Sequence, residues 1–159
     1  SLVVLHSVSV PPDGFSGNWV ERFFLTRLDP QAHPYFSTIA GLQVSAHFLI
    51  RRDGQAIQFV GCDRRAWHAG QSIWQGRENC NEYSVGIELE GSDSQPFSAV
   101  QYAALWRLID ALRARYPLRA IAGHCHVAPG RKSDPGPYFD WSALRRRYPA
   151  LGPAPEVAG

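Results

Sequence analysis

The sequence contains no methionine, few cysteines and no long apolar run. Its three cysteines, Cys62, Cys80 and Cys125, include no Cys-x-x-Cys pair, which argues against both a disulfide framework and a cysteine-based zinc knuckle. A reducing compartment is the simpler interpretation, and one disulfide plus a free thiol is the alternative. No apolar run approaches the roughly 20 residues that a membrane-spanning helix needs, so we expect no membrane partner.

A large net charge is also missing. Sixteen Lys and Arg side chains are balanced by 14 Asp and Glu side chains, which gives a formal net charge of +2. This balance produces no strong basic field, so we expect no nucleic-acid partner. The local run Arg145–Arg147 is interpreted as the solvated face of a last helix, with an anion-binding patch as the alternative.

The remaining composition is typical of one folded domain. A length of 159 residues, with 45% hydrophobic and 19% charged residues, fits a single domain that can bury a core. The expected strands are Leu2–Ser9, Val44–Ile50, Ala56–Val60, Ser84–Glu90 and Ala120–Cys125. The expected helices are Val20–Leu28, a helix capped by Ser98 that runs to about Arg115, and a helix capped by Asp140 that runs through Arg147.

Strands interleaved with helices predict a mixed α/β single domain. We place the domain at residues 1–151 and expect a loose tail over residues 152–159, which contain two prolines. The long helix that follows Ser98 has a periodic apolar side. The residues assigned to that side are Val100, Leu105, Leu108, Ile109 and Leu112.

Six histidines invite a metal hypothesis. His124 and His126 form a His-x-His pair on or just after a strand, where residues two apart point to the same face, so both could reach one metal. The spacing leaves open which of the two binds. His6 ends an apolar strand and could equally be a half-buried histidine bonded to backbone. We interpret His33 and His47 as structural.

His68 lies in the run Trp67–Gly70, an aromatic–His–small–Gly pattern that either lines a groove or forms a turn with a packed tryptophan. Asp134 lies in a loop, residues 131–137, whose proline and glycine restrict the backbone as a positioned ligand requires. Lys132 in this loop is the only lysine of the chain, beside fifteen arginines. Because a lysine is a compact point charge with an adjustable pKa, we interpret it as functional.

Two carboxylates end the strand at residues 84–90. Val85, Ile87 and Leu89 are predicted to share one face of this strand, while Glu88 and Glu90 share the other. Buried carboxylates are unfavourable unless they are paired or functional, so either could be a general base. Glu88 lies deeper in the strand, so its pKa is predicted to be raised more by desolvation.

These residues recur within blocks that resemble a known family. The blocks are residues 3–6, 44–50, 66–70, 86–91, 123–125 and 128–137, in this order. Together they resemble the N-acetylmuramoyl-L-alanine amidase type 2 family, which includes phage amidases and peptidoglycan-recognition proteins. Four further segments, residues 11–12, 29–34, 76–78 and 139–141, are similar to its cytoplasmic 1,6-anhydro-N-acetylmuramoyl-L-alanine amidase branch. The resemblance covers nearly the whole chain up to about Trp141.

The resemblance implies a mixed central β-sheet flanked by helices and one zinc ion per chain held by His6, His124 and Asp134. It assigns Lys132 to the developing oxyanion and Glu88 to proton transfer. His126 stands where this branch is expected to carry aspartate.

The implied activity is hydrolysis of the lactyl–L-alanine amide bond of 1,6-anhydro-N-acetylmuramoyl peptides in peptidoglycan recycling. The implied setting is the cytoplasm, with a muropeptide as partner and a monomeric chain. A periplasmic amidase acting on intact peptidoglycan and a non-catalytic muropeptide-binding module are the alternatives.

Overall fold

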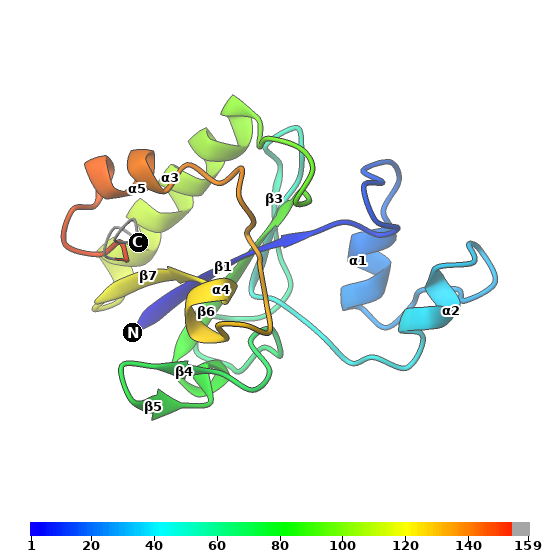
Figure 1. Cartoon of the computed structure of the whole chain (residues 1–159), viewed down its shortest axis with the longest axis horizontal. Coiled ribbons are helices and arrows are strands. Elements are labelled where there is room, and N and C mark those ends of the chain that lie inside the picture. The colour runs from blue at the N-terminus through cyan, green and yellow to red at the C-terminus, as the bar shows by residue number, and fades with distance from the viewer. Residues whose placement is uncertain (154–159) are drawn as a thin grey trace.

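The computed structural model describes residues 1–153 and has a five-stranded sheet at its centre (Figure 1). The strands lie in the order β3-β2-β6-β1-β7. Their bounds are β1 Leu2–Val8, β2 Phe48–Ile50, β3 Ala56–Gln58, β6 Ser84–Glu90 and β7 Ala120–Gly123. Strands β2, β6, β1 and β7 pair in parallel, and the edge strand β3 pairs antiparallel with β2. The predicted mixed sheet in a single α/β domain is therefore confirmed.

Helices and a small ribbon cover the two faces of this sheet. Helices α3 (Ala99–Arg115) and α5 (Trp141–Arg147) lie over one face. The other face carries α4 (His124–Val127), the ribbon of β4 (Ile73–Trp74) and β5 (Arg77–Glu78), and the 3₁₀ turn η1 (Cys80–Glu82). Helices α1 (Trp19–Phe24) and α2 (Phe36–Ile39) form a separate lobe beyond the carboxyl end of β1 (Figure 1).

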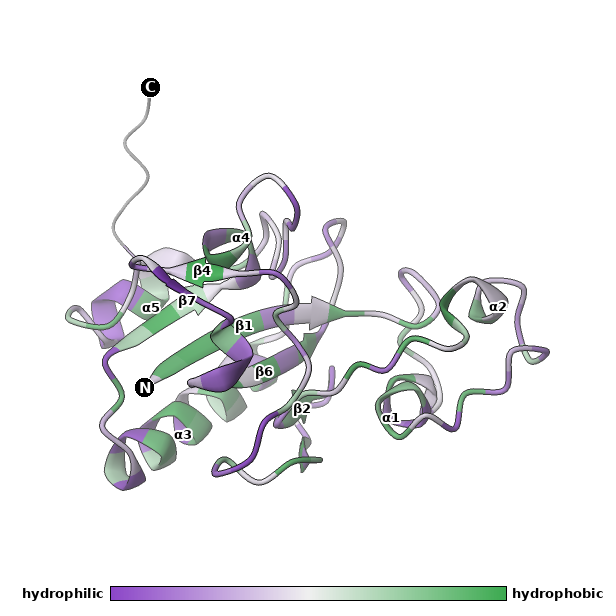
Figure 2. Ribbon diagram, turned by 90° about the horizontal axis from the view of Figure 1, so that it is seen from below, coloured by the Kyte–Doolittle hydropathy of each residue, from purple (hydrophilic) through white to green (hydrophobic). Residues whose placement is uncertain are grey.

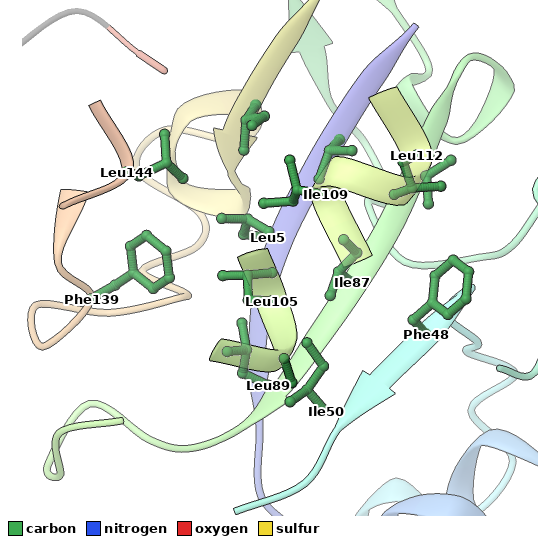
Figure 3. Close-up of a cluster of buried hydrophobic side chains, with 14 of the residues drawn as sticks. Leu5, Phe48, Ile50, Ile87, Leu89, Leu105, Ile109, Leu112, Phe139 and Leu144 are labelled. Carbon is green, nitrogen blue, oxygen red and sulfur yellow. The ribbon is translucent and has the colours of Figure 1, made fainter. Parts of the chain in front are cut away.

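The main hydrophobic core lies between the sheet and α3. Figure 3 shows Leu5 of β1 and Ile87 of β6 among Leu105 and Ile109 of the helix. Because successive strand residues point to opposite faces, the neighbours of Leu5 and Ile87 along each strand face away from α3. His6 and Glu88 are among these neighbours.

The central strand changes character along its length. Figure 2 shows β1 as hydrophobic at its start and hydrophilic towards its carboxyl end. Leu2 and Val4 belong to a second apolar cluster on the face covered by α4. His6 follows them on that same face and is 1% exposed. The polar residue His6 therefore follows directly after well-packed apolar residues on the same face of β1.

Helix α3 begins as predicted. Ser98 accepts a hydrogen bond from the Gln101 backbone N–H, and the Gln101 side chain accepts one from the Ser98 backbone N–H, which forms a capping box. The assignment of Val100 to the apolar side is wrong, because Val100 is 51% exposed. At roughly 100° per residue, Val100 lies about 140° around the helix from Leu105, which is fully buried.

Several predicted boundaries differ from those observed. The strand expected from Val44 begins only at Phe48, and the strand expected to reach Val60 ends at Gln58. The helix expected to reach Leu28 ends at Phe24, because Thr26 adopts a φ of 55° and its N–H bonds to the Phe23 carbonyl. Helix α2 and the β4–β5 ribbon were not predicted.

The start of the predicted tail is packed against the domain. The Gly152 N–H donates to the Tyr148 carbonyl at 3.3 Å, and Pro153 is buried. Residues 154–159, which make up the rest of that tail, lie outside the described residues. Among the described helices, none has both the length and the apolar character that crossing a membrane requires.

Candidate metal centre

The strand register brings three chemically important segments to one edge of the sheet. His6 of β1 pairs with Glu88 of β6, and Leu5 pairs with Gly123 of β7. His124 follows directly after β7, so it lies beside His6. Because these strands are parallel, their carboxyl ends meet at the same edge, where α/β sheets commonly bind ligands.

Three side chains converge at this edge. The Nδ1 atoms of His6 and His124 lie 3.0 Å apart, and the Asp134 Oδ2 atom lies 3.0 Å from the first and 3.1 Å from the second. These three residues form a group that could hold a metal ion. Ligands of a tetrahedral zinc ion at about 2.0–2.1 Å would lie about 3.3–3.4 Å apart, so the separations fit such an ion closely.

The outer nitrogen of His124 shows which atom is available for a metal. Its Nε2 lies 2.9 Å from the Ala69 carbonyl oxygen, which can only accept a hydrogen bond. Nε2 therefore carries the proton, and in the neutral ring Nδ1 presents a lone pair towards His6 and Asp134. The outer Nε2 of His6 in turn contacts His68 Nδ1 at 2.9 Å.

The electrostatics favour an anionic Asp134 beside a neutral His6 and a neutral His68. Burial would raise the pKa of Asp134, but its close contacts with His124 and His6 outweigh burial and lower this pKa below its usual range. Burial lowers the pKa of His6, although Asp134 opposes that effect. Burial and the neighbouring histidines lower the pKa of His68 well below its usual value. Neutral imidazole and carboxylate are the forms that bind zinc.

The expectation that His124 and His126 share one face is wrong. The strand ends at Gly123, and α4 begins at His124, so the two histidines are two residues apart on a helical turn. Residues at that spacing do not share a face of a helix. His126 Nδ1 accepts the Gly123 N–H at 2.8 Å, and its ring packs edge-on against Trp141 at 4.8 Å.

A cavity beside the three converging atoms contains the other predicted site residues. It is lined by His6, His124, Asp134, Glu88 and Lys132, and on another side by Phe23, Phe24, Val44, Trp67 and neighbouring residues. The sequence prediction therefore named five residues that the fold brings together. The apolar wall from the α1 lobe was not predicted, because its contribution depends on how that lobe folds back towards the sheet.

Glu88 is the carboxylate that faces this cavity. It is 8% exposed, and among the described residues its buried Oε2 has no hydrogen-bond partner. Burial raises the pKa of Glu88 well above its usual range, repulsion from Asp134 adds to this, and Lys132 opposes it. Such a carboxyl group is poised to accept and release a proton.

Glu90 has a structural role instead. It accepts the Arg52 backbone N–H at 2.9 Å and lies 3.8 Å from the Arg51 Nε atom. Burial raises the pKa of Glu90, while these two contacts oppose the effect. Glu90 does not line the cavity, so of the two carboxylates that the sequence left open, Glu88 is the one placed for chemistry.

The loop that carries Lys132 and Asp134 is held at several points. The Cys125 N–H donates to the Asp134 carbonyl, and the Lys132 N–H donates to the Ala128 carbonyl. Ser133 Oγ donates to Asp93 Oδ2 at 2.8 Å. Gly136 has a φ of 90°, and a Cβ there would lie 2.3 Å from Asp93 Oδ1, so this position requires glycine. These contacts fix the backbone of the loop at several points, as its composition predicted.

The remaining histidines have distinct surroundings. His47 accepts the Gly86 N–H and donates to the Arg64 carbonyl, which links the sheet to a loop. His33 is exposed and accepts the Tyr35 N–H. His68 is buried and contacts His6, a role for which its sequence pattern was only a weak signal.

Comparison with known proteins identifies a family whose members are similar to this chain. The family model described as N-acetylmuramoyl-L-alanine amidase matches residues 1–137, a range that contains all five predicted site residues. Over 147 residues the chain is 54% identical to the 1,6-anhydro-N-acetylmuramyl-L-alanine amidase AmpD of Citrobacter freundii, and the match covers 91% of this chain and 79% of that protein.

Two solved structures extend this similarity to the fold. A crystal structure of a selenomethionine derivative of AmpD matches with a TM-score of 0.89 and 53% identity, over 92% of this chain and 83% of that one. The amidase AmiD from Escherichia coli, in complex with anhydro-N-acetylmuramic acid-L-Ala-D-γ-Glu-L-Lys, matches with a TM-score of 0.71 and 28% identity. That match covers 98% of this chain and 59% of AmiD.

The raised pKa of Glu88 predicts a dependence of stability on pH. A carboxyl group whose pKa is higher in the folded state stabilises the fold below its unfolded pKa of about 4.3, and this stabilisation is lost as the pH rises through the folded pKa. Metal-free Glu88→Gln protein should therefore be more stable than the parent at about pH 7.5, by about 1–3 kcal/mol. The difference should shrink as the pH falls towards about 4.5.

Urea unfolding of both metal-free proteins at several pH values measures this difference. Equal free energies of unfolding at neutral pH would show that the Glu88 carboxylate is not held in an unfavourable site.

Proposed function

Because the chain belongs to the N-acetylmuramoyl-L-alanine amidase family, we propose that it is a zinc-dependent hydrolase that cleaves the lactyl–L-alanine amide bond of 1,6-anhydro-N-acetylmuramoyl peptides. One observation carries the proposal: two imidazole nitrogens and a carboxylate oxygen converge within 3.1 Å of one another, beside the buried Glu88, whose Oε2 has no hydrogen-bond partner among the described residues. His6, His124 and Asp134 would hold the zinc ion, one per chain.

A zinc ion held by these three residues would supply Lewis acidity and would make a water molecule more acidic. Glu88 accepts the proton of the attacking water at its carboxylate oxygen. It then returns that proton to the nitrogen of the leaving L-alanine. Its raised pKa suits this transfer in both directions, because a proton that is bound too weakly would not be delivered.

Lys132 would contribute positive charge beside the reacting carbonyl, because it lines the same cavity as the three ligand residues and Glu88. The lysine and Asp134 belong to the same rigid loop, so the ammonium group is held near the metal ligands by the backbone. In this position the lysine stabilises the negative charge that develops on the carbonyl oxygen. Its exposed side chain needs little desolvation before substrate arrives.

The proposed substrate is supported by the similarity of the chain to known amidases and by the residues that line the cavity. The relative named above is an amidase of 1,6-anhydro-N-acetylmuramyl-L-alanine, and AmiD was solved with an anhydro-muramoyl peptide. In this chain Phe23, Val44 and Trp67 form an apolar wall beside the polar centre, which suits an amphipathic sugar-peptide. Within residues 1–153 the three cysteines form no disulfide, in keeping with action on free fragments in a reducing cytoplasm as part of peptidoglycan recycling.

Zinc content tests the ligand set. Purified parent protein should contain about one zinc ion per chain, and His124→Ala should lose it, because two ligands bind zinc far more weakly than three. The matched control is His126→Gln in the same helical turn, which should keep its zinc. Inductively coupled plasma mass spectrometry measures both. A parent without zinc would favour a non-catalytic muropeptide-binding module.

Turnover tests the two catalytic assignments. Glu88→Ala should retain zinc but lose hydrolysis of anhydromuropeptide, and Lys132→Ala should lower kcat by about a hundred- to a thousand-fold. Product formation is followed by mass spectrometry, with zinc content measured on the same samples. Hydrolysis by Glu88→Ala at the parental rate would show that the base has been assigned wrongly.

The same assay separates the two enzymatic alternatives. Parent protein is given anhydromuropeptide or intact sacculi at matched amide concentration. A recycling enzyme should release peptide much faster from the fragments, whereas a periplasmic wall amidase would release it from sacculi at a comparable rate.

A further inference from the structure

Both histidines of the metal centre have their outer nitrogens bonded to the same short segment. His6 Nε2 lies 2.9 Å from His68 Nδ1, and His124 Nε2 lies 2.9 Å from the Ala69 carbonyl oxygen. His68 and Ala69 are adjacent in the chain and lie far in sequence from either ligand. A single dipeptide therefore determines the orientation of both rings.

This dipeptide is itself fixed by a buried amide. Asn81 Oδ1 accepts the backbone N–H groups of His68 and Ala69, at 3.1 Å and 2.9 Å. On the other side, Arg131 donates to the Ala69 carbonyl at 2.7 Å, which ties the segment to the loop of Lys132 and Asp134. The segment is thus part of a connected hydrogen-bond network.

The His68 ring occupies a gap on one face of the sheet. Gly86 of β6 leaves this gap, because a Cβ at that position would lie 2.5 Å from the His68 ring. The histidine is 8% exposed, and its ring meets that of His6 nearly edge-on, at 5.0 Å between centroids. The lack of a side chain at Gly86 therefore leaves room for the His68 ring beside His6.

The direction of the hydrogen bonds can be followed from a backbone carbonyl to the metal centre. Ser84 Oγ donates its proton to the Cys80 carbonyl, so it can only accept from His68 Nε2, which lies 3.4 Å away. With its proton on Nε2, neutral His68 presents a lone pair at Nδ1. This lone pair accepts a hydrogen bond from the N–H at His6 Nε2. Neutral His6, with its proton on Nε2, is therefore unprotonated at Nδ1.

We propose that His68 is a positioning residue that acts as a hydrogen-bond acceptor and holds His6 in the Nε2–H tautomer, so that His6 Nδ1 faces the metal site. The inference rests on the proposed zinc function. It adds a residue that does not touch zinc or substrate but determines which nitrogen of His6 is available. Groups that orient a metal ligand in this way typically change metal affinity about 10- to 100-fold when they are removed.

Two substitutions separate hydrogen bonding from packing. His68→Phe keeps a ring of similar size in the gap above Gly86 but has no acceptor. His68→Asn leaves more empty space but can place its amide oxygen near the position of Nδ1. If acceptance is what matters, zinc affinity should fall about 10- to 100-fold in His68→Phe and stay close to the parental value in His68→Asn.

Zinc affinity is measured by competition with a chromophoric chelator, with the fold of each variant checked by circular dichroism. Unchanged affinity in His68→Phe would overturn the inference, as would weaker binding by His68→Asn than by His68→Phe, because that order reports packing. A parent that binds no zinc would instead contradict the proposed function, so the two failures are distinguishable.

A measurement on the unaltered protein keeps the inference testable if a variant does not fold. Long-range ¹H–¹⁵N correlation spectra of the zinc-loaded parent distinguish the two neutral tautomers of each histidine. His68 should carry its proton on Nε2, with Nδ1 unprotonated. A proton on His68 Nδ1 would place two donors opposite each other and would overturn the inference.

Discussion

Two imidazole lone pairs and a carboxylate that face one another within about 3 Å repel unless a cation or shared protons lie between them. Much of the rest of the structure holds this unfavourable group in place. His6 and His124 come from the ends of adjacent parallel strands, and Asp134 comes from a loop fixed by backbone hydrogen bonds. Strand pairing and backbone hydrogen bonds thus fix the segments that carry the three ligand atoms, which is what preorganised sites require.

The division of the sheet into two faces explains how the fold accommodates such a polar group. Strand residues that point towards α3 are apolar and fully packed, so the core does not depend on the site. On β1 the opposite face begins apolar with Leu2 and Val4 and becomes polar at its carboxyl end, where His6 lies beside Glu88 of β6. One register thus serves both stability and chemistry, and a slip of one residue would exchange the two faces.

Local signals made part of this arrangement predictable. Strand β6 was predicted with its observed ends because its side chains alternate between core and site, and α3 was predicted because Ser98 is a good N-cap before a periodic apolar run. The choice between His124 and His126 was not predictable from spacing, because it depends on where β7 ends. The role of His68 was not predictable from the sequence either, because it depends on contacts with Gly86 and His6, which are distant from it in sequence.

The central claim is that His6, His124 and Asp134 bind a single zinc ion. X-ray diffraction from crystals of the purified protein, recorded on both sides of the zinc absorption edge, tests it most directly. We expect one anomalous peak about 2.0–2.2 Å from His6 Nδ1, His124 Nδ1 and an Asp134 carboxylate oxygen. A peak bound by His126, or no peak in crystals grown with zinc, would contradict it.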